Sequence, residues 1–289
     1  MGGDGATYDI GFGALSRVLV SETPIKIVVL NTGAYSNTGG QTSTASYTAQ
    51  DSDLTRFGGA HSGKHEDRKE LGLIAAFHPK VLVIQTNAAL QAHFMKNVMD
   101  FLTYNESPAV FDTYTTCQSE HGIADDAGSQ RATLAVESRM SPVFVHDPRK
   151  GDTLAERFSL EGNPEIGKDW ITTTLEYVDD NGSAQLMEIP FTPADFAVHE
   201  GRFKKHFRRL NGAGEPVPIA EYLDLRKEDR HGKVPFVWST DAKKKLEEEN
   251  RQLKDTLKEL EQKVNRKEAE LAEAAKQNSA VSERVKEKV

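Results

Sequence analysis

Two segments within the first forty residues restrict most strongly how this chain can fold. A Gly3-Asp4-Gly5 turn opens the sequence, and the apolar run Ile25–Leu30 ends at the polar loop Asn31–Gln41. Glycines let backbone N–H groups approach phosphate oxygens closely. The Asp4 carboxylate and the Thr32 hydroxyl are hard oxygen ligands of the kind that Mg²⁺ takes beside phosphates. The pattern predicts a metal-diphosphate site, although an Asp between two glycines is also typical of a simple turn.

Residues 4–148 alternate apolar runs with helical patterns, which predicts an α/β fold with a largely parallel sheet. The expected strands are Ile25–Leu30, Val81–Gln85 and Ala109–Thr113, with Val143–His146 as a candidate edge strand, and the expected helices are Ile10–Val20, Leu71–Phe77 and Ala88–Leu102. The polar segment Thr42–His65 is expected to form a long surface loop, with Gly63-Lys64 on the surface. Ligands in such sheets bind outside the carboxyl ends of strands, where the loop after Leu30 lies.

Residues 149–240 no longer alternate apolar runs with helical patterns, and their pattern predicts a smaller α+β extension. Trp170–Tyr177 and Gln185–Ile189 alternate in strand fashion across the turn 179–182, which indicates a hairpin. Thr192 followed by Pro193 predicts the start of a helix. The basic cluster is interpreted as a solvated helix face, with docking of an acidic electron carrier as the alternative; its members are Arg202, Lys204, Lys205, Arg208 and Arg209.

Residues 241–289 predict a charged C-terminal helix. Leucines and valines recur there at heptad spacing among Glu and Lys, and Asn250 falls at an a position, which favours two strands in register. A dimeric coiled coil and a lone charged helix both remain open.

Composition excludes several classes of protein. The net charge of −8 argues against a nucleic-acid partner held by a basic surface. No apolar run approaches the ~20 residues of a membrane helix, and no signal peptide is recognisable. A single cysteine, Cys117, rules out an internal disulfide and suits a reducing compartment. We therefore expect a cytoplasmic protein without a membrane partner.

An ordered set of short motifs resembles the thiamine-diphosphate-binding domain of pyruvate:ferredoxin (flavodoxin) oxidoreductases, which are 2-oxoacid:acceptor oxidoreductases. The resemblance covers roughly the first half of the chain well, the next eighty or so residues loosely and the last fifty or so not at all. The motifs lie at residues 3–11, 35–41, 63–64, 67–72, 107–108, 117, 121–123 and 134–138.

The resemblance implies roles for six residues. Asp4, Thr32 and the backbone carbonyl of Ala34 would bind Mg²⁺ with the diphosphate oxygens, while Gly3 and Gly5 would flank the cofactor. Asn37 would lie near the reacting end of thiamine diphosphate, where an amide could orient substrate or stabilise developing charge. A turn-forming role of Asn37 is the alternative. Relatives often have Asp-Thr-Glu-Val where this chain has Asn-Thr-Gly-Ala at 31–34, so the loop is less acidic here.

Cys117 matches the fourth ligand of a [4Fe–4S] cluster in the resembling family, since it stands at the family spacing before His121-Gly122-Ile123. A cluster needs several thiolates, so the other three would have to come from elsewhere. The alternative is a small buried apolar side chain.

The resemblance implies oxidative decarboxylation of a 2-oxoacid such as pyruvate, with coenzyme A as acyl acceptor and electrons passing through iron–sulfur clusters to ferredoxin or flavodoxin. We expect the chain to be a C-terminal piece or subunit that works with upstream domains or a partner subunit, as a homodimer. One alternative is a non-oxidative thiamine-dependent decarboxylase in which Cys117 is inert. The other is a catalytically dead interaction domain.

Overall fold

The computed structural model describes residues 1–55, 57–58, 61–179 and 181–239, together with residues 256, 258, 260, 263, 264, 266 and 267. Met1–Trp238 forms one compact unit and Ser239–Val289 a second. Among the described residues of the second unit, those between 256 and 267 are helical, whereas Ser239 is not. Most of the heptad pattern lies outside the described residues, so the coiled coil and the dimer remain predictions.

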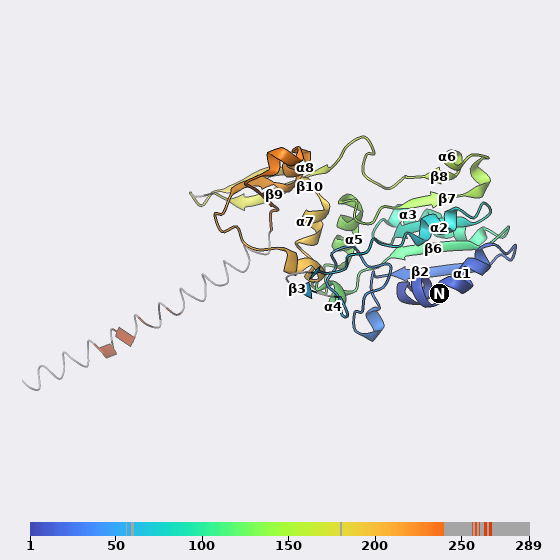
Figure 1. Cartoon of the computed structure of the whole chain (residues 1–289), viewed down its shortest axis with the longest axis horizontal. Helices are drawn as coiled ribbons and strands as arrows, with labels where there is room; N and C mark the ends of the chain where they lie inside the picture. Colours follow the sequence, from blue (N-terminus) through green and yellow to red (C-terminus); the bar gives the residue numbers. More distant parts are fainter. Residues whose placement is uncertain are drawn as a thin grey trace, which may run out of the picture. The chain divides into compact units, whose positions relative to one another are not determined.

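The first unit is built on a six-stranded, mostly parallel sheet (Figure 1). The strand order is β1 (Gly2–Gly3), β2 (Lys26–Asn31), β6 (Ala109–Tyr114), β5 (Leu82–Asn87), β7 (Phe144–His146) and β8 (Phe158–Ser159). The first four strands are parallel to one another, and β7 and β8 are antiparallel additions. The predicted α/β fold is thus confirmed. It could be predicted because parallel strands that are buried on both faces appear in the sequence as continuous apolar runs.

The edge position predicted for Val143–His146 is wrong. The strand β7 lies inside the sheet, because β8 pairs with its outer side through Val145 and His146. A strand of two residues carries too little pattern to be recognised from sequence.

Helices cover both faces of the sheet. On one face, α1 (Phe12–Leu19) and α2 (Leu71–Ala76) pack on Val29, Val83 and Val110. On the other, α3 (Gln91–Thr103) packs on Ile84 and Phe111. The first predicted helix starts two residues late, because Gly5–Ile10 forms a separate π-helical turn, η1. The three predicted helices are otherwise confirmed within a few residues.

A third cluster of buried side chains lies beyond the sheet and joins α5 (Gly128–Glu137) and α7 (Pro193–Ala197) to Tyr47 and Tyr114. The predicted cap of α7 is confirmed: the Thr192 hydroxyl accepts from the Ala194 N–H, and the Asp195 carboxylate accepts from the Thr192 N–H at 2.9 Å. The remaining helical segments are α4 (Gln118–His121), α6 (Leu154–Arg157), α8 (Ile219–Asp224), η2 (Ser36–Thr38), η3 (Pro148–Lys150), η4 (Gly201–His206) and η5 (Lys227–Arg230).

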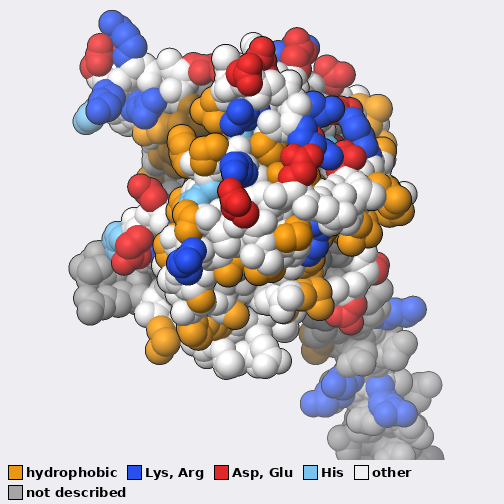
Figure 2. All heavy atoms as spheres, turned by 90° about the vertical axis from the view of Figure 1, so that its right-hand side faces the viewer, with side chains coloured by type: hydrophobic (Ala, Val, Ile, Leu, Met, Phe, Trp, Pro, Cys, Tyr) orange, Lys and Arg blue, Asp and Glu red, His pale blue; other side chains and the backbone are white. Residues whose placement is uncertain are grey.

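The predicted hairpin of the extension is confirmed as the antiparallel pair β9 (Ile171–Val178) and β10 (Ala184–Phe191). A short parallel pair follows, β11 (Glu215–Pro218) and β12 (Lys233–Phe236). All of these lie in the same compact unit as the sheet, and the boundary drawn at residue 148 stays a prediction. On the face shown in Figure 2, acidic and basic side chains are intermixed with hydrophobic ones.

The segment Thr42–His65 is a long connection beside the site, as predicted, but the expectation that it lies on the surface is wrong. Ser43, Ser46 and Gln50 are buried, and a small hairpin joins β3 (Phe57–Gly58) to β4 (His61–Ser62). Lys64 is also buried, with its ammonium 2.6 Å from the Ser46 carbonyl oxygen. The polar side chains of this segment form hydrogen bonds inside the protein, which composition alone does not reveal.

Candidate functional site

Three predicted site residues follow neighbouring strands. Asp4 comes after β1, Thr32 after β2, and Cys117 three residues after β6. Because β1, β2 and β6 are adjacent and parallel, their carboxyl ends meet at one edge of the sheet. The topology therefore brings together residues that are far apart in the sequence.

Asp4 is buried at this edge and receives several hydrogen bonds. Its Oδ1 accepts from the Thr32 N–H at 3.2 Å and lies 3.1 Å from the Thr32 hydroxyl, and its Oδ2 accepts from Ser43 at 2.7 Å. Burial raises the pKa of Asp4, although the bonds from Ser43 and Thr32 oppose this effect. The carboxylate is thus fixed in direction, and its remaining lone pairs are available to a cation.

The oxygens of Asp4, Thr32 and Ala34 have spacings that suit a magnesium ion. The Thr32 hydroxyl lies 3.1 Å from Asp4 Oδ1 and 3.1 Å from the Ala34 carbonyl oxygen. Neighbouring ligands of an octahedral Mg²⁺ are separated by about 2.9 Å, given bonds of about 2.1 Å. Ser36 Oγ lies 2.8 Å from the Thr32 hydroxyl. It can accept the Thr32 proton when the lone pair of the Thr32 hydroxyl faces a metal. These three residues therefore fit the predicted metal group.

The donor set contains one carboxylate and two neutral oxygens. Among the residues that the structure describes, no group of three His, Cys, Asp or Glu side chains could hold a metal. A hard cation at Asp4 would therefore need further oxygen ligands from outside, as Mg²⁺ commonly does with phosphates.

Two buried side chains hold the Asn31–Ala34 loop from behind. The Thr32 carbonyl accepts from His121 Nε2 at 2.7 Å and from Arg202 Nη1 at 3.4 Å. Burial, with the positive charge of Arg202, lowers the pKa of His121 well below 6.5. A neutral ring must then carry its proton on Nε2, because a carbonyl oxygen can only accept. The sequence marks His121 only as part of the motif at residues 121–123, and gives no sign that its ring bonds to the Thr32 carbonyl.

The prediction that the basic cluster is a solvated helix face is wrong for Arg202. Its side chain is fully buried and pairs with Glu200 at 2.6 Å, while its guanidinium packs over the Tyr47 ring. Lys205 pairs with Asp51 at 2.6 Å, and the other three members, Lys204, Arg208 and Arg209, are exposed. The Glu-Gly-Arg sequence at 200–202 contains no periodicity that would mark Arg202 as buried.

The predicted glycines differ in their surroundings. A β-carbon on Gly5 would lie 2.4 Å from the Tyr35 ring, so a larger residue fits there only if that ring moves. A β-carbon on Gly3 would meet no atom within 4 Å, so the space beside it is open. Asn37, on η2, is exposed, and its side chain is therefore accessible to a ligand.

Cys117 lies immediately before α4 and is half-buried. Its Sγ is 3.5 Å from Ser119 Oγ. Burial raises the pKa of the thiol, but hydrogen bonds with Ser119, the Glu120 backbone and Ser36 outweigh it, and the pKa falls below the usual range. Because Ser36 also contacts the Thr32 hydroxyl, one side chain links Cys117 to the oxygens of the predicted metal site.

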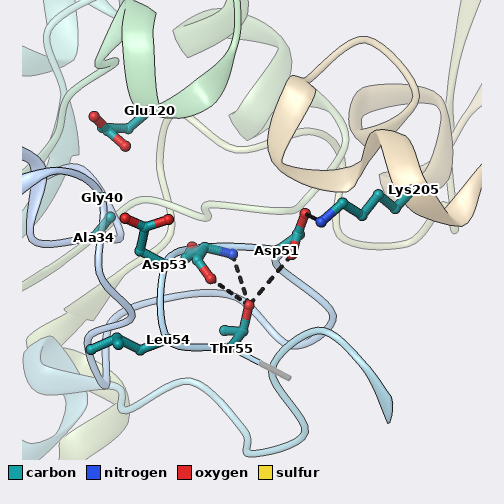
Figure 3. Close-up of a pocket in the computed structure, with 9 residues that line it drawn as sticks. Ala34, Gly40, Asp51, Asp53, Leu54, Thr55, Glu120 and Lys205 are labelled. Carbon is teal, nitrogen blue, oxygen red and sulfur yellow. Dashed lines mark hydrogen bonds and ion pairs between the residues drawn. The ribbon is translucent and has the colours of Figure 1, made fainter. Parts of the chain in front are cut away.

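A cavity of about 420 Å³ opens beside this site (Figure 3). It was not predicted. Its lining contains three acidic residues, Asp51, Asp53 and Glu120, and one lysine; the other members are Ala34, Gly40, Ser52, Leu54 and Thr55. Ala34 thus borders both the oxygen cluster and the cavity. The Asp-Ser-Asp sequence at 51–53 was the available signal, but it lay in a segment interpreted as surface loop.

Part of the chain is similar to known proteins. Residues 1–112 match the family described as thiamine pyrophosphate enzyme, C-terminal TPP binding domain. The chain is 34% identical over 180 residues to pyruvate:ferredoxin oxidoreductase of Moorella thermoacetica, covering 62% of this chain and 14% of that protein. It is 32% identical over 164 residues to a probable pyruvate-flavodoxin oxidoreductase of Escherichia coli, covering 57% and 14%.

A mitochondrial pyruvate dehydrogenase [NADP(+)] of Euglena gracilis is 31% identical over 221 residues, which cover 73% of this chain and 12% of that protein. The aligned part of the chain thus spans about one seventh of the length of the first curated relatives. In the described residues, no helix has the length and apolar character required to cross a membrane. The chain is a relative of the pyruvate:ferredoxin and pyruvate-flavodoxin oxidoreductases, and its residues 1–112 match the thiamine-pyrophosphate-binding domain family.

Proposed function

We propose that this chain supplies the thiamine-diphosphate-binding part of a 2-oxoacid oxidoreductase of the pyruvate type, and that it acts with further domains or subunits of the same enzyme. The observation that carries the proposal is the convergence of the Asp4, Thr32 and Ala34 oxygens, at 3.1 Å spacings, beside an open glycine turn. The names of the relatives support the same reaction class.

Each side of the site has its own task in this proposal. Asp4, Thr32 and the Ala34 carbonyl hold Mg²⁺, and the backbone at Gly3 and Gly5 lies against the diphosphate. When bound, thiamine diphosphate supplies the electron sink for decarboxylation. Asn37, exposed on η2, orients the 2-oxoacid or stabilises charge on its oxygen. The buried His121 and Arg202 keep the Thr32 carbonyl fixed.

Cys117 acts in the electron path as one ligand of a [4Fe–4S] cluster. Its lowered pKa favours the thiolate that iron requires. The chain has one cysteine, so the remaining thiolates come from other domains or a partner subunit. The acceptor is ferredoxin or flavodoxin, coenzyme A takes the acyl group, and the enzyme works as a cytoplasmic homodimer.

Calorimetric titration of Mg²⁺–thiamine diphosphate into the chain tests the site. We expect Asp4→Ala to abolish binding, because the only carboxylate of the donor set is lost. Asp125→Ala, which makes the same change in charge at an exposed position, should bind as the wild type does. Thr32→Val gives a second test that retains the charge.

Two results would contradict the proposal. One is unchanged affinity in a folded Asp4→Ala chain. The other is a folded wild-type chain that binds no Mg²⁺–thiamine diphosphate even in the assembled enzyme, which would favour an interaction domain. In that case, truncation before Asp241 should change the association state. Absence of iron and acid-labile sulfide from an active assembly would favour the non-oxidative decarboxylase.

A further inference from the structure

Behind the candidate metal-binding loop, three buried side chains form a line of hydrogen bonds. Tyr8, on η1, and Asp112, on β6, are almost completely buried, and so is Asn31 at the end of β2. Asn31 Nδ2 lies 2.8 Å from the Tyr8 hydroxyl, which in turn contacts Asp112 Oδ2. At the other end, Asn31 Oδ1 accepts from the Gly33 N–H at 3.1 Å.

The Gly33 amide fixes the direction of every bond in this line. An N–H can only donate, so the Asn31 oxygen must face Gly33 and its NH₂ must face Tyr8. The tyrosine oxygen accepts from that NH₂, so its own proton goes to the Asp112 carboxylate. The buried Arg68 guanidinium also interacts with Tyr8 and Asp112, and the Asn31 side chain makes a hydrogen bond to Asp112 in addition to its bond to Tyr8. The arrangement is therefore consistent in one orientation, with Asp112 as its terminal acceptor.

The line ends at a glycine whose backbone conformation depends on the absence of a side chain. Gly33 adopts a positive φ of 69°, a backbone region that side-chain-bearing residues rarely occupy. It separates Thr32 from Ala34, and the Thr32 hydroxyl lies 3.1 Å from the Ala34 carbonyl oxygen. The Gly33 carbonyl is held independently by Ser46 at 2.6 Å and Gln50 at 2.9 Å. The Asn31 side chain bonds to the Gly33 N–H, and other side chains hold the Gly33 carbonyl.

We infer that Tyr8 is a positioning residue: held by Asp112, it orients Asn31, which fixes the Gly33 amide and thereby presets the Thr32 and Ala34 oxygens for the metal. The inference rests on the proposed function for the identity of the ligand, but the relay itself is a property of the free chain. Tyr8 is not expected to contact cofactor or substrate.

Tyr8→Phe is the central test because it keeps the ring, which packs among Leu15, Val29 and Leu71, and removes only the hydroxyl. Tyr104→Phe is the matched control. It removes the hydroxyl of another buried tyrosine, one that donates to the Lys80 carbonyl at 2.5 Å and makes no bond to the loop. A general loss of stability should affect both variants alike.

Two quantities are measured in the full chain: hydrogen exchange of the Gly33 amide by nuclear magnetic resonance, and calorimetric affinity for Mg²⁺–thiamine diphosphate. We expect Tyr8→Phe to accelerate Gly33 exchange and to weaken affinity about 3- to 10-fold, the effect of one hydrogen bond. Tyr104→Phe should change neither. If Gly33 exchange in Tyr8→Phe equals that in Tyr104→Phe, or if affinity is unchanged despite faster exchange, the inference is wrong.

Asn31→Ala provides a second variant and a coupling test. It removes the acceptor of the Gly33 N–H directly, so adding Tyr8→Phe to it should cause no further change in exchange or affinity. Additive effects would overturn the relay. If the wild type binds no Mg²⁺–thiamine diphosphate even in the assembled enzyme, the proposed function fails, yet the exchange measurement still decides the relay. If it binds but Gly33 exchange is insensitive to Tyr8, the relay fails and the proposed function stands.

Discussion

The candidate site has two sides that differ in how they are held. The closed side comprises Asp4, the Asn31–Ala34 loop and the side chains behind it, and its predicted ligands lie within a buried hydrogen-bond network. The open side comprises Asn37, Cys117 and the acidic cavity, where side chains are exposed or half-buried. The proposed anchor for a metal and diphosphate is therefore held rigidly by its neighbours, while the face proposed to meet substrate and cluster leaves room for other groups.

The largest expected effect comes from breaking the ion pair on the closed side. Arg202→Met should cost about 3–5 kcal/mol in the free energy of unfolding, because it leaves the fully buried Glu200 without a counter-charge. Urea unfolding measures the difference. Lys205→Met, at a half-exposed pair on the open side, should cost less than about 1 kcal/mol. Equal losses in the two variants would contradict the contrast between the sides.

A smaller effect should appear in the pH dependence of stability. Burial raises the pKa of Asp112 from 3.8 to about 6, with its bond to Tyr8 and the charge of Arg68 opposing the rise. The folded state then binds more protons than the unfolded state within this window. The contribution of Asp112 to the free energy of unfolding should fall as the pH rises from about 4 to about 6, and stay level above that.

Asp112→Asn should remove this slope. Denaturation curves collected between pH 4 and pH 7 for both proteins give the comparison. A wild-type curve that parallels the variant's throughout the window would show that Asp112 titrates normally.

The smallest expected effect concerns the open side. Ser36→Ala removes a hydrogen bond that lowers the pKa of Cys117, so that pKa should rise. Because the chain has one cysteine, the pH profile of its alkylation by iodoacetamide reports this residue alone. Thr38→Ala, on the same turn, is the control. A profile that shifts equally in both variants would indicate a general disturbance of the turn.

The same contrast explains what could be predicted from sequence. Strands such as β2 are largely apolar runs, and Thr32 directly follows β2, so the fold class and the placement of Thr32 could be predicted. Asp4 follows the two-residue strand β1 and was identified only by its Gly-Asp-Gly turn. The buried hydrogen bonds that support the loop could not be predicted. Gln50 and Arg202 are polar residues that pair with groups far away in the sequence, and no local pattern distinguishes them from exposed ones.

Two further elements, α5 and η1, were missed in the sequence for local reasons. The helix α5 begins without a side-chain cap and with Gly128 and Ser129 in its first turn, so its sequence lacked a start signal. The turn η1 changes the spacing of the first helical segment, because a π-helical turn contains more residues than an α-helical one. Tyr8 was therefore not recognised as facing the loop.

The close approach of Gly5 to Tyr35 connects the two sides mechanically. The Tyr35 ring occupies the space where a β-carbon at position 5 would lie, and Tyr35 immediately precedes the turn that carries Asn37. Even the single methyl of alanine would push that ring outward without replacing any ligand oxygen. A substitution at position 5 could therefore shift the turn proposed to meet the substrate, without placing a mutation inside the cavity itself.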